Sequence, residues 1–100
     1  MAERRFYLVW MFPVVRDRLQ QRFPSVPLAE ILEVVRVELG PRAEEGRQAP
    51  FPYPSGVFLL TLENNTSQGR FRITPLYEFS REDRAVEVLD IGIVRVGDGH

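Results

Sequence analysis

The chain has 100 residues, 44% hydrophobic and 27% charged, with a formal net charge of −1 at pH 7. This balance favours one globular domain over residues 1–100 and argues against a disordered chain. No apolar stretch is long enough to cross a membrane, and no cleavage site of small residues follows the apolar run near the N-terminus. We therefore expect a cytoplasmic protein that does not engage a membrane.

The residue types that are missing narrow the chemistry further. The chain has no cysteine and no lysine, all 13 basic residues are arginine, and the only histidine is His100. A cysteine nucleophile, a lysine Schiff base and a zinc site of cysteine and histidine are therefore ruled out. No glycine-rich phosphate loop is present either, so we expect neither a cofactor nor a metal. Catalysis would need carboxylates, tyrosines or arginines, and arginine is suited to holding phosphate or stabilising charge.

The first 40 residues predict a strand followed by two helices. Residues 4–11 are rich in aromatic and β-branched side chains and predict a strand. Residues 13–23 predict a short helix, with Pro13 in its first turn. A second helix is expected with Ser25 as its cap and Pro27 in its first turn, and it should end at Gly40-Pro41. Its core-facing stripe would consist of Leu28, Ile31, Leu32, Val35 and Leu39.

Residues 41–56 form a proline-rich segment, PRAEEGRQAPFPYPSG, that predicts a loop with an extended, polyproline-like path. Phe51 and Tyr53 lie between its prolines. They are candidate binding residues, either as platforms that stack on a base or a peptide or as aromatics folded over a sheet edge.

Three more strands are expected after the loop, over residues 57–63, 71–79 and 85–96. The polar segment 64–69 and the charged segment 80–84 should be the turns between them. Pro75 cannot donate a ladder hydrogen bond, so it suggests a bulge or an edge position. The last strand is apolar on both faces, as in a well-covered strand. The order β-α-α-β-β-β predicts an α+β fold, an antiparallel sheet of about four strands with both helices on one face.

The segments GRFRITPLYEF and AVEVLDIGIVR, joined by a short charged turn, carry a resemblance to a known family. Together with the element order they resemble the RelE/ParE toxin superfamily, in which a strand of the form YRVIYEV precedes one of the form VEVLRIGHR. The resemblance implies either a ribosome-dependent mRNA endoribonuclease or a toxin that acts on gyrase. It also implies a partner, an antitoxin that wraps and neutralises the toxin.

Carried over by position, the basic residues of the family correspond to Arg70, Arg72 and, displaced by one place, Arg95. The resemblance implies that these three hold phosphate and stabilise negative charge while a weak base activates the ribose hydroxyl. Arg70 and Arg72 share one strand face because they are two residues apart. Arg95 could join them from the next strand if the register allows it. The alternative is that all three are solvated rim charges paired across the sheet with glutamates.

The chain also departs from the family pattern. Ile93 replaces the family's histidine, Val94 replaces the arginine that follows it, and no tyrosine lies beyond Tyr77. The net charge of −1 lacks the basic surplus of a protein that docks on ribosomal RNA. Only residues 1–22 are locally basic, with five arginines against two acids. Arg16 lies there, off the apolar stripe of its helix, and is a further candidate binding residue.

Two classes of function are therefore open. One is a RelE-like toxin that cleaves mRNA on the ribosome. The other is a non-catalytic protein-interaction module, regulatory or dimeric, that binds through a sheet edge, the helix pair or the proline-rich loop. A chance convergence of common α+β patterns is a third possibility, since a fold does not fix a function.

Overall fold

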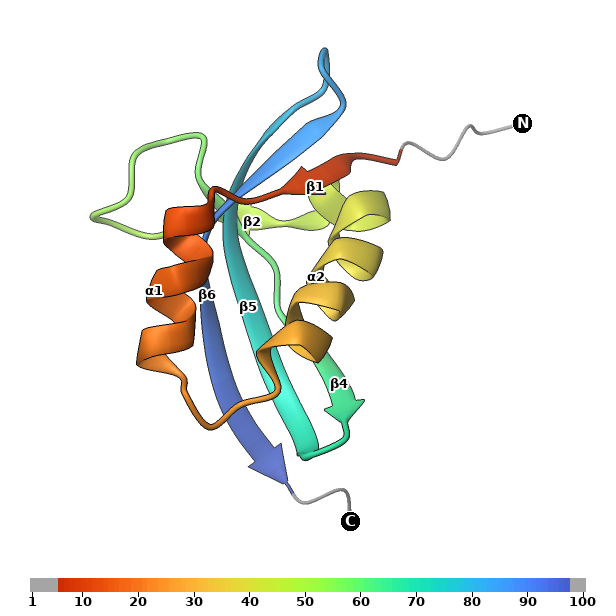
Figure 1. Ribbon diagram of the computed structural model, residues 1–100. Coiled ribbons are helices and arrows are strands. Elements are labelled where there is room, and N and C mark those ends of the chain that lie inside the picture. Colours follow the sequence, from red (N-terminus) through yellow and green to blue (C-terminus); the bar gives the residue numbers. More distant parts are fainter. Residues whose placement is uncertain (1–5, 98–100) are drawn as a thin grey trace.

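Two layers, a mixed sheet and a pair of helices, make up the fold of this computed structural model, which describes residues 6–97 (Figure 1). The expected first strand began at Arg4, which lies outside the described residues, as does His100. The elements in chain order are β1 (Leu8–Trp10), α1 (Pro13–Arg22), α2 (Leu28–Arg42), the 3₁₀ turn η1 (Ala43–Glu45), β2 (Arg47–Gln48), β3 (Phe58–Leu59), β4 (Leu62–Thr66), β5 (Gly69–Ser80) and β6 (Ala85–Gly97).

The long antiparallel hairpin of β5 and β6 confirms the prediction for this part of the chain. Its ladder contains a bulge next to Pro75, as the missing proline N–H suggested. Leu76 pairs with Asp90 and Tyr77 with Val88, so Leu89 is the extra residue. The bulge shifts the alternation of β6 by one residue. Both halves of its apolar run therefore turn toward the helices, with Val86, Val88, Ile91 and Ile93 all buried.

The prediction of an antiparallel sheet of about four strands was wrong in its details. The sheet has six strands in the order β1-β6-β5-β3-β2, and β4 also pairs with β5. β1 runs parallel to β6, with Val9 opposite Val86. A short apolar segment contains no signal for the direction in which it will pair, because side-chain alternation is the same in both directions.

The strand expected over residues 57–63 is divided into β3 and β4. β3 pairs with Leu76 and Tyr77, and β4 pairs with β5 up to Ile73. The gap between them lies opposite Thr74 and Pro75, where the proline offers no N–H to a ladder. The segment 64–69, expected as a turn, is mostly strand. Its Asn64 side chain donates a hydrogen bond of 2.7 Å to Glu38 of α2, which ties the edge of the sheet to the helix layer.

The two helices lie close to their expected positions. α1 begins at Pro13 as predicted, while α2 begins at Leu28, just after Pro27, and ends at Arg42, one residue beyond the expected end at Gly40-Pro41. A proline this close to the end removes only one hydrogen bond of the helix. Residues 41–56, expected as a loop, thus include the end of α2, η1 and β2. The Phe51–Pro52 bond is cis, and the Tyr53 N–H donates to the Pro50 carbonyl in a turn.

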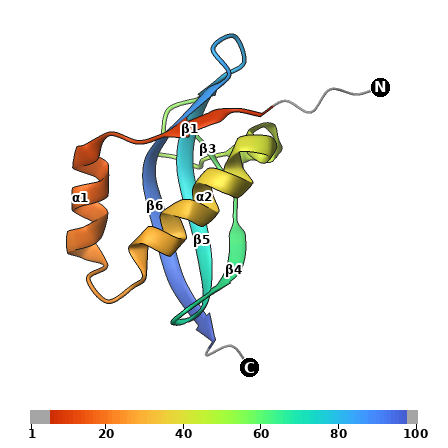
Figure 2. The same cartoon turned by 45° about the vertical axis from the view of Figure 1, so that its right-hand side comes forward.

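The hydrophobic core lies between the helix layer and the inner face of the sheet, the face that α2 crosses (Figure 2). α2 supplies Ile31, Val35 and Leu39, and α1, which lies beside β6, supplies Leu19. Within residues 6–97 no charged side chain is buried. No helix of this part of the chain is both long and apolar enough to cross a membrane.

Candidate functional site

Arg70 and Arg72 lie where the sequence placed them, on the outer face of β5, which points away from the helices. Both are exposed, and both face one carboxylate of β4. The Arg70 Nε lies 3.4 Å from Glu63 Oε1, and the Arg72 Nη2 lies 3.9 Å from Glu63 Oε2. Exposed pairs of this length contribute at most about 1 kcal/mol to stability, so they leave both guanidinium groups accessible but partly neutralised.

Arg95 does not join these two arginines. It pairs with Phe71 in the ladder, and Phe71 points to the inner face, whereas Arg72 pairs with Val94 on the outer face. The Arg95 guanidinium lies 4.7 Å from the centre of the Phe71 ring and donates a hydrogen bond to the Gln68 carbonyl. The bulge at Leu89 is not visible in the alternation of the sequence. The three predicted catalytic arginines are therefore divided between the two faces of the sheet.

The predicted binding residues lie at separate places. Phe51 is 95% exposed at the turn between β2 and β3, and Tyr53 next to it is 47% exposed. Arg16 lies on the exposed side of α1, at the mouth of a hollow between the two helices.

Tyr77 is the tyrosine nearest the family's motif, but its position excludes it as a general acid or base. Its side chain is fully buried, and its hydroxyl donates a hydrogen bond of 2.6 Å to the Ala43 carbonyl. Burial raises the pKa of Tyr77 to about 12. Gly46 packs against it so closely that a Cβ at that position would lie 2.0 Å from the hydroxyl oxygen. Tyr77 thus joins η1 to the sheet and has a structural role.

An exposed apolar strip, which the sequence did not reveal, runs along β1 into the start of α1. Every second residue from 6 to 14 is apolar and exposed, with Leu8 at 71% and Trp10 at 38%. Of the residues between them, Tyr7 is buried and Val9 and Met11 pack against the core, whereas Pro13 is exposed. Because all of these positions are apolar, the sequence shows no contrast between the two faces. The strip consists of Phe6, Leu8, Trp10, Phe12 and Val14.

The outer edge of β1 is covered at one point by the end of α2. The Tyr7 N–H donates a hydrogen bond of 3.0 Å to the Gly40 carbonyl. A Cβ on Gly40 would lie 3.0 Å from the Tyr7 carbonyl oxygen, so glycine permits this close approach. A partner strand could not pair along the whole of this edge. The strip is therefore accessible through its side chains rather than through the backbone of β1.

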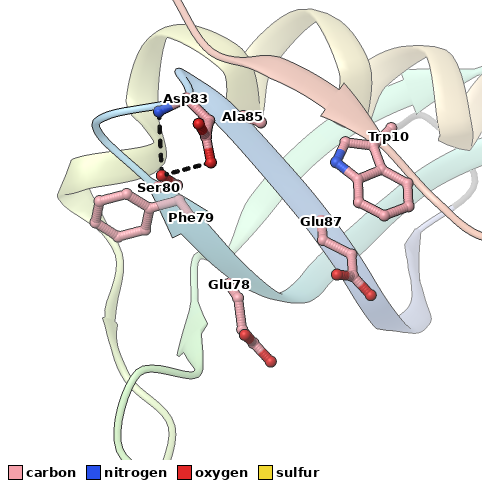
Figure 3. A pocket seen from close by; sticks show the side chains of 7 residues that line it. All are labelled: Trp10, Glu78, Phe79, Ser80, Asp83, Ala85 and Glu87. Carbon is pink, nitrogen blue, oxygen red and sulfur yellow. Dashed lines mark hydrogen bonds between the residues drawn. The ribbon is translucent and has the colours of Figure 1, made fainter.

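Next to Trp10, the outer face of the sheet has a shallow hollow of about 230 Å³ with acidic walls (Figure 3). Glu78 and Glu87 are directly opposite each other in the ladder, and neither forms an ion pair with any residue in the range 6–97. Asp83 accepts a hydrogen bond from the Ser80 hydroxyl and donates its N–H back to it. Like charges opposite each other destabilise a sheet. This end of the outer face therefore favours cationic groups over phosphate.

No cluster of three or more metal-binding side chains exists in the part of the chain that the structure describes. A scan of protein-family models, a search of curated proteins and a search of solved structures each found no match to the chain. The fold and the candidate site define an α+β protein with an exposed apolar strip on one edge of a mixed sheet.

Proposed function

We propose that this protein acts by binding another protein through the apolar strip of Phe6, Leu8, Trp10, Phe12 and Val14. The observation that carries the proposal is the exposure of five apolar side chains in alternate positions of one short segment, residues 6–14. Isolated exposed apolar residues are normal on a folded protein, but five of them within nine residues, three with aromatic rings, are typical of an interaction surface.

The composition of the strip also fits a protein partner. Aromatic residues are enriched at protein interfaces and provide most of the binding energy at their centres. Trp10 and Phe12 already pack edge to face, with ring centres 4.8 Å apart, so their rings need little ordering when a partner arrives. Glu87 lies opposite Trp10 in the ladder and Glu78 lines the same hollow, so their carboxylates would favour a basic side chain at the rim of the partner.

The alternative proposal, a RelE-like mRNA endoribonuclease, rests on the resemblance of the β5 and β6 segments and on the exposure of Arg70 and Arg72. Three observations weaken its support: both arginines face Glu63, Arg95 lies on the other face, and the outer face turns acidic at Glu78. An antitoxin of the kind that the resemblance implies is one candidate for the partner of the strip, and a second copy of this chain is another.

Crosslinking in the native cell tests the binding proposal. A photoactivatable amino acid replaces Leu8 in one variant and Phe12 in another, and Val37 serves as the matched control. Val37 is also apolar and exposed, but it lies on α2, away from the strip. We expect a discrete crosslinked product from positions 8 and 12 and none from position 37. A product of twice the mass of the chain would identify a second copy as the partner. Equal products from all three positions, or no product, would refute the proposal.

The endoribonuclease proposal has a separate test. The chain is expressed in growing cells and the ends of the transcripts are mapped. New ends that are lost when both Arg70 and Arg72 are changed to alanine would support a nuclease. Intact messages and normal growth would count against it without affecting the binding proposal.

A further inference from the structure

A second hollow, of about 270 Å³, lies on the inner side of the molecule between α1, α2 and the end of β1. The buried side chains of Val88 and Ile91 from β6 line it, and Leu32 of α2 forms one wall. Two guanidinium groups border it from opposite sides, Arg16 from α1 and Arg36 from α2. The hollow therefore combines an apolar lining with positive charge at its border.

The two arginines differ in how their charge is balanced. Arg36 donates two hydrogen bonds to Glu33, from Nε at 3.0 Å and from Nη2 at 2.5 Å. The Arg16 side chain forms no hydrogen bond or ion pair with any residue in the range 6–97, although its backbone N–H donates to the Phe12 carbonyl. One guanidinium with no partner among residues 6–97 thus lies beside an apolar hollow. Its planar group offers the geometry that binds a carboxylate through two parallel hydrogen bonds.

We propose that this hollow binds a small monocarboxylate with an apolar body, such as a medium-chain fatty acid. The carboxylate pairs with Arg16, and the alkyl chain lies against the partly exposed Leu32, Val9 and Met11, above the buried Val88 and Ile91. The volume is just below the range of about 300–1,000 Å³ that is usual for ligand pockets, which suits one short chain and excludes a large cofactor. The hollow shares only Trp10 with the strip, and the inference does not depend on the proposed protein partner.

The proposal predicts how affinity varies with the ligand. Each methylene group that enters the hollow should tighten binding about fourfold until the hollow is full. Octanoate should therefore bind more tightly than hexanoate. Octan-1-ol has the same chain but no charge, so it should bind at least about tenfold more weakly than octanoate, because it cannot form the charged pair with Arg16.

Titration calorimetry of the full chain with octanoate tests the proposal. Trp10 also borders the hollow, and as the only tryptophan its fluorescence gives a second readout. We expect saturable binding of one molecule per chain. Arg16→Gln should weaken it about tenfold or more. Arg18→Gln is the matched control, because Arg18 is exposed on the same helix, has no ion pair within residues 6–97 and does not line the hollow. It should change the affinity less than about twofold.

A third variant tests the hollow itself. Leu32→Phe adds volume inside it without a change of charge, and it should weaken octanoate more than hexanoate. Thermal unfolding of each variant confirms that it is folded. The absence of saturable binding, equal affinity for octanoate and octan-1-ol, or equal effects of Arg16→Gln and Arg18→Gln would each overturn the proposal.

Discussion

Two rows of apolar side chains in this protein occupy alternate positions of the sequence, but one row is buried and the other is exposed. On β5, the inward row of Phe71, Ile73 and Tyr77 is completely covered by the helix layer. On β1 and the start of α1, the strip from Phe6 to Val14 is exposed. The difference shows that alternation along a strand determines which residues share a face, while the packing of other elements determines whether that face is covered. An uncovered row is the part of the molecule that is open to a partner.

The largest expected effect is the difference in stability loss when one residue of each row is changed to alanine. Ile73→Ala should lower the free energy of unfolding by about 2–5 kcal/mol, because it leaves a cavity beside Ile93 and Leu62. Leu8→Ala should change it by less than about 0.5 kcal/mol, because Leu8 is 71% exposed. Urea denaturation of both variants measures the difference. Similar losses at the two positions would show that the strip is covered in solution.

A somewhat smaller effect is expected at Gly46, where the covered row meets η1. Gly46→Ala would place a Cβ 2.0 Å from the Tyr77 hydroxyl, so the variant should lose about 1–3 kcal/mol of stability. In a Tyr77→Phe background the clashing oxygen is absent, and the same change should cost less. A double-mutant cycle measured by denaturation tests this coupling. Strict additivity would contradict the close packing of Gly46 and Tyr77.

The buried Tyr77 also predicts a dependence on high pH. Its pKa is raised by burial from 10.0 to about 12, so the folded state keeps the proton that the unfolded chain releases. The contribution of Tyr77 is fully present below pH 10 and decreases as the pH rises toward 12. Stability in that window should therefore fall more steeply for the wild type than for Tyr77→Phe. Parallel slopes in thermal melts between pH 9 and 11.5 would contradict the burial of this hydroxyl.

The smallest effect is expected at the end of the covered row. Arg95→Ala removes a cation over the Phe71 ring and should cost about 0.5–1 kcal/mol. Arg72→Ala removes only a long exposed pair with Glu63 and should cost less than about 0.5 kcal/mol. We compare the denaturation midpoints of the two variants, and we expect the lower midpoint for Arg95→Ala, on the inner face. A larger loss for Arg72→Ala would contradict the register of the hairpin.

Local patterns in the sequence predicted the hairpin of β5 and β6 and both helices, because those elements depend on contacts between near neighbours. Pairing between distant segments was not predictable in the same way. The parallel pairing of β1, the division of β3 from β4 opposite Pro75 and the bulge at Leu89 each depend on how strands meet in space. The bulge matters most for the candidate site, since it places Arg95 on the face opposite to Arg72.

The exposure of the strip could not be predicted from the sequence, for a different reason. Residues 6–15 are apolar at nearly every position, so the sequence predicted a strand without indicating which side would be covered. The glycine that matters there, Gly40, lies more than 30 residues away and brings the end of α2 against Tyr7. Only the folded structure shows that the end of α2 contacts β1 at Tyr7 while the side chains of Leu8 and Trp10 stay exposed.

One measurement tests the central claim, that the strip is a binding surface and not part of the core. A photoactivatable amino acid at position 14, at the end of the strip, is introduced into the wild type and into a Leu8→Ser, Phe12→Ser double variant. Thermal unfolding of the double variant should match that of the wild type closely, and its crosslinked product should be lost. An unchanged yield of product from a folded double variant would contradict the account.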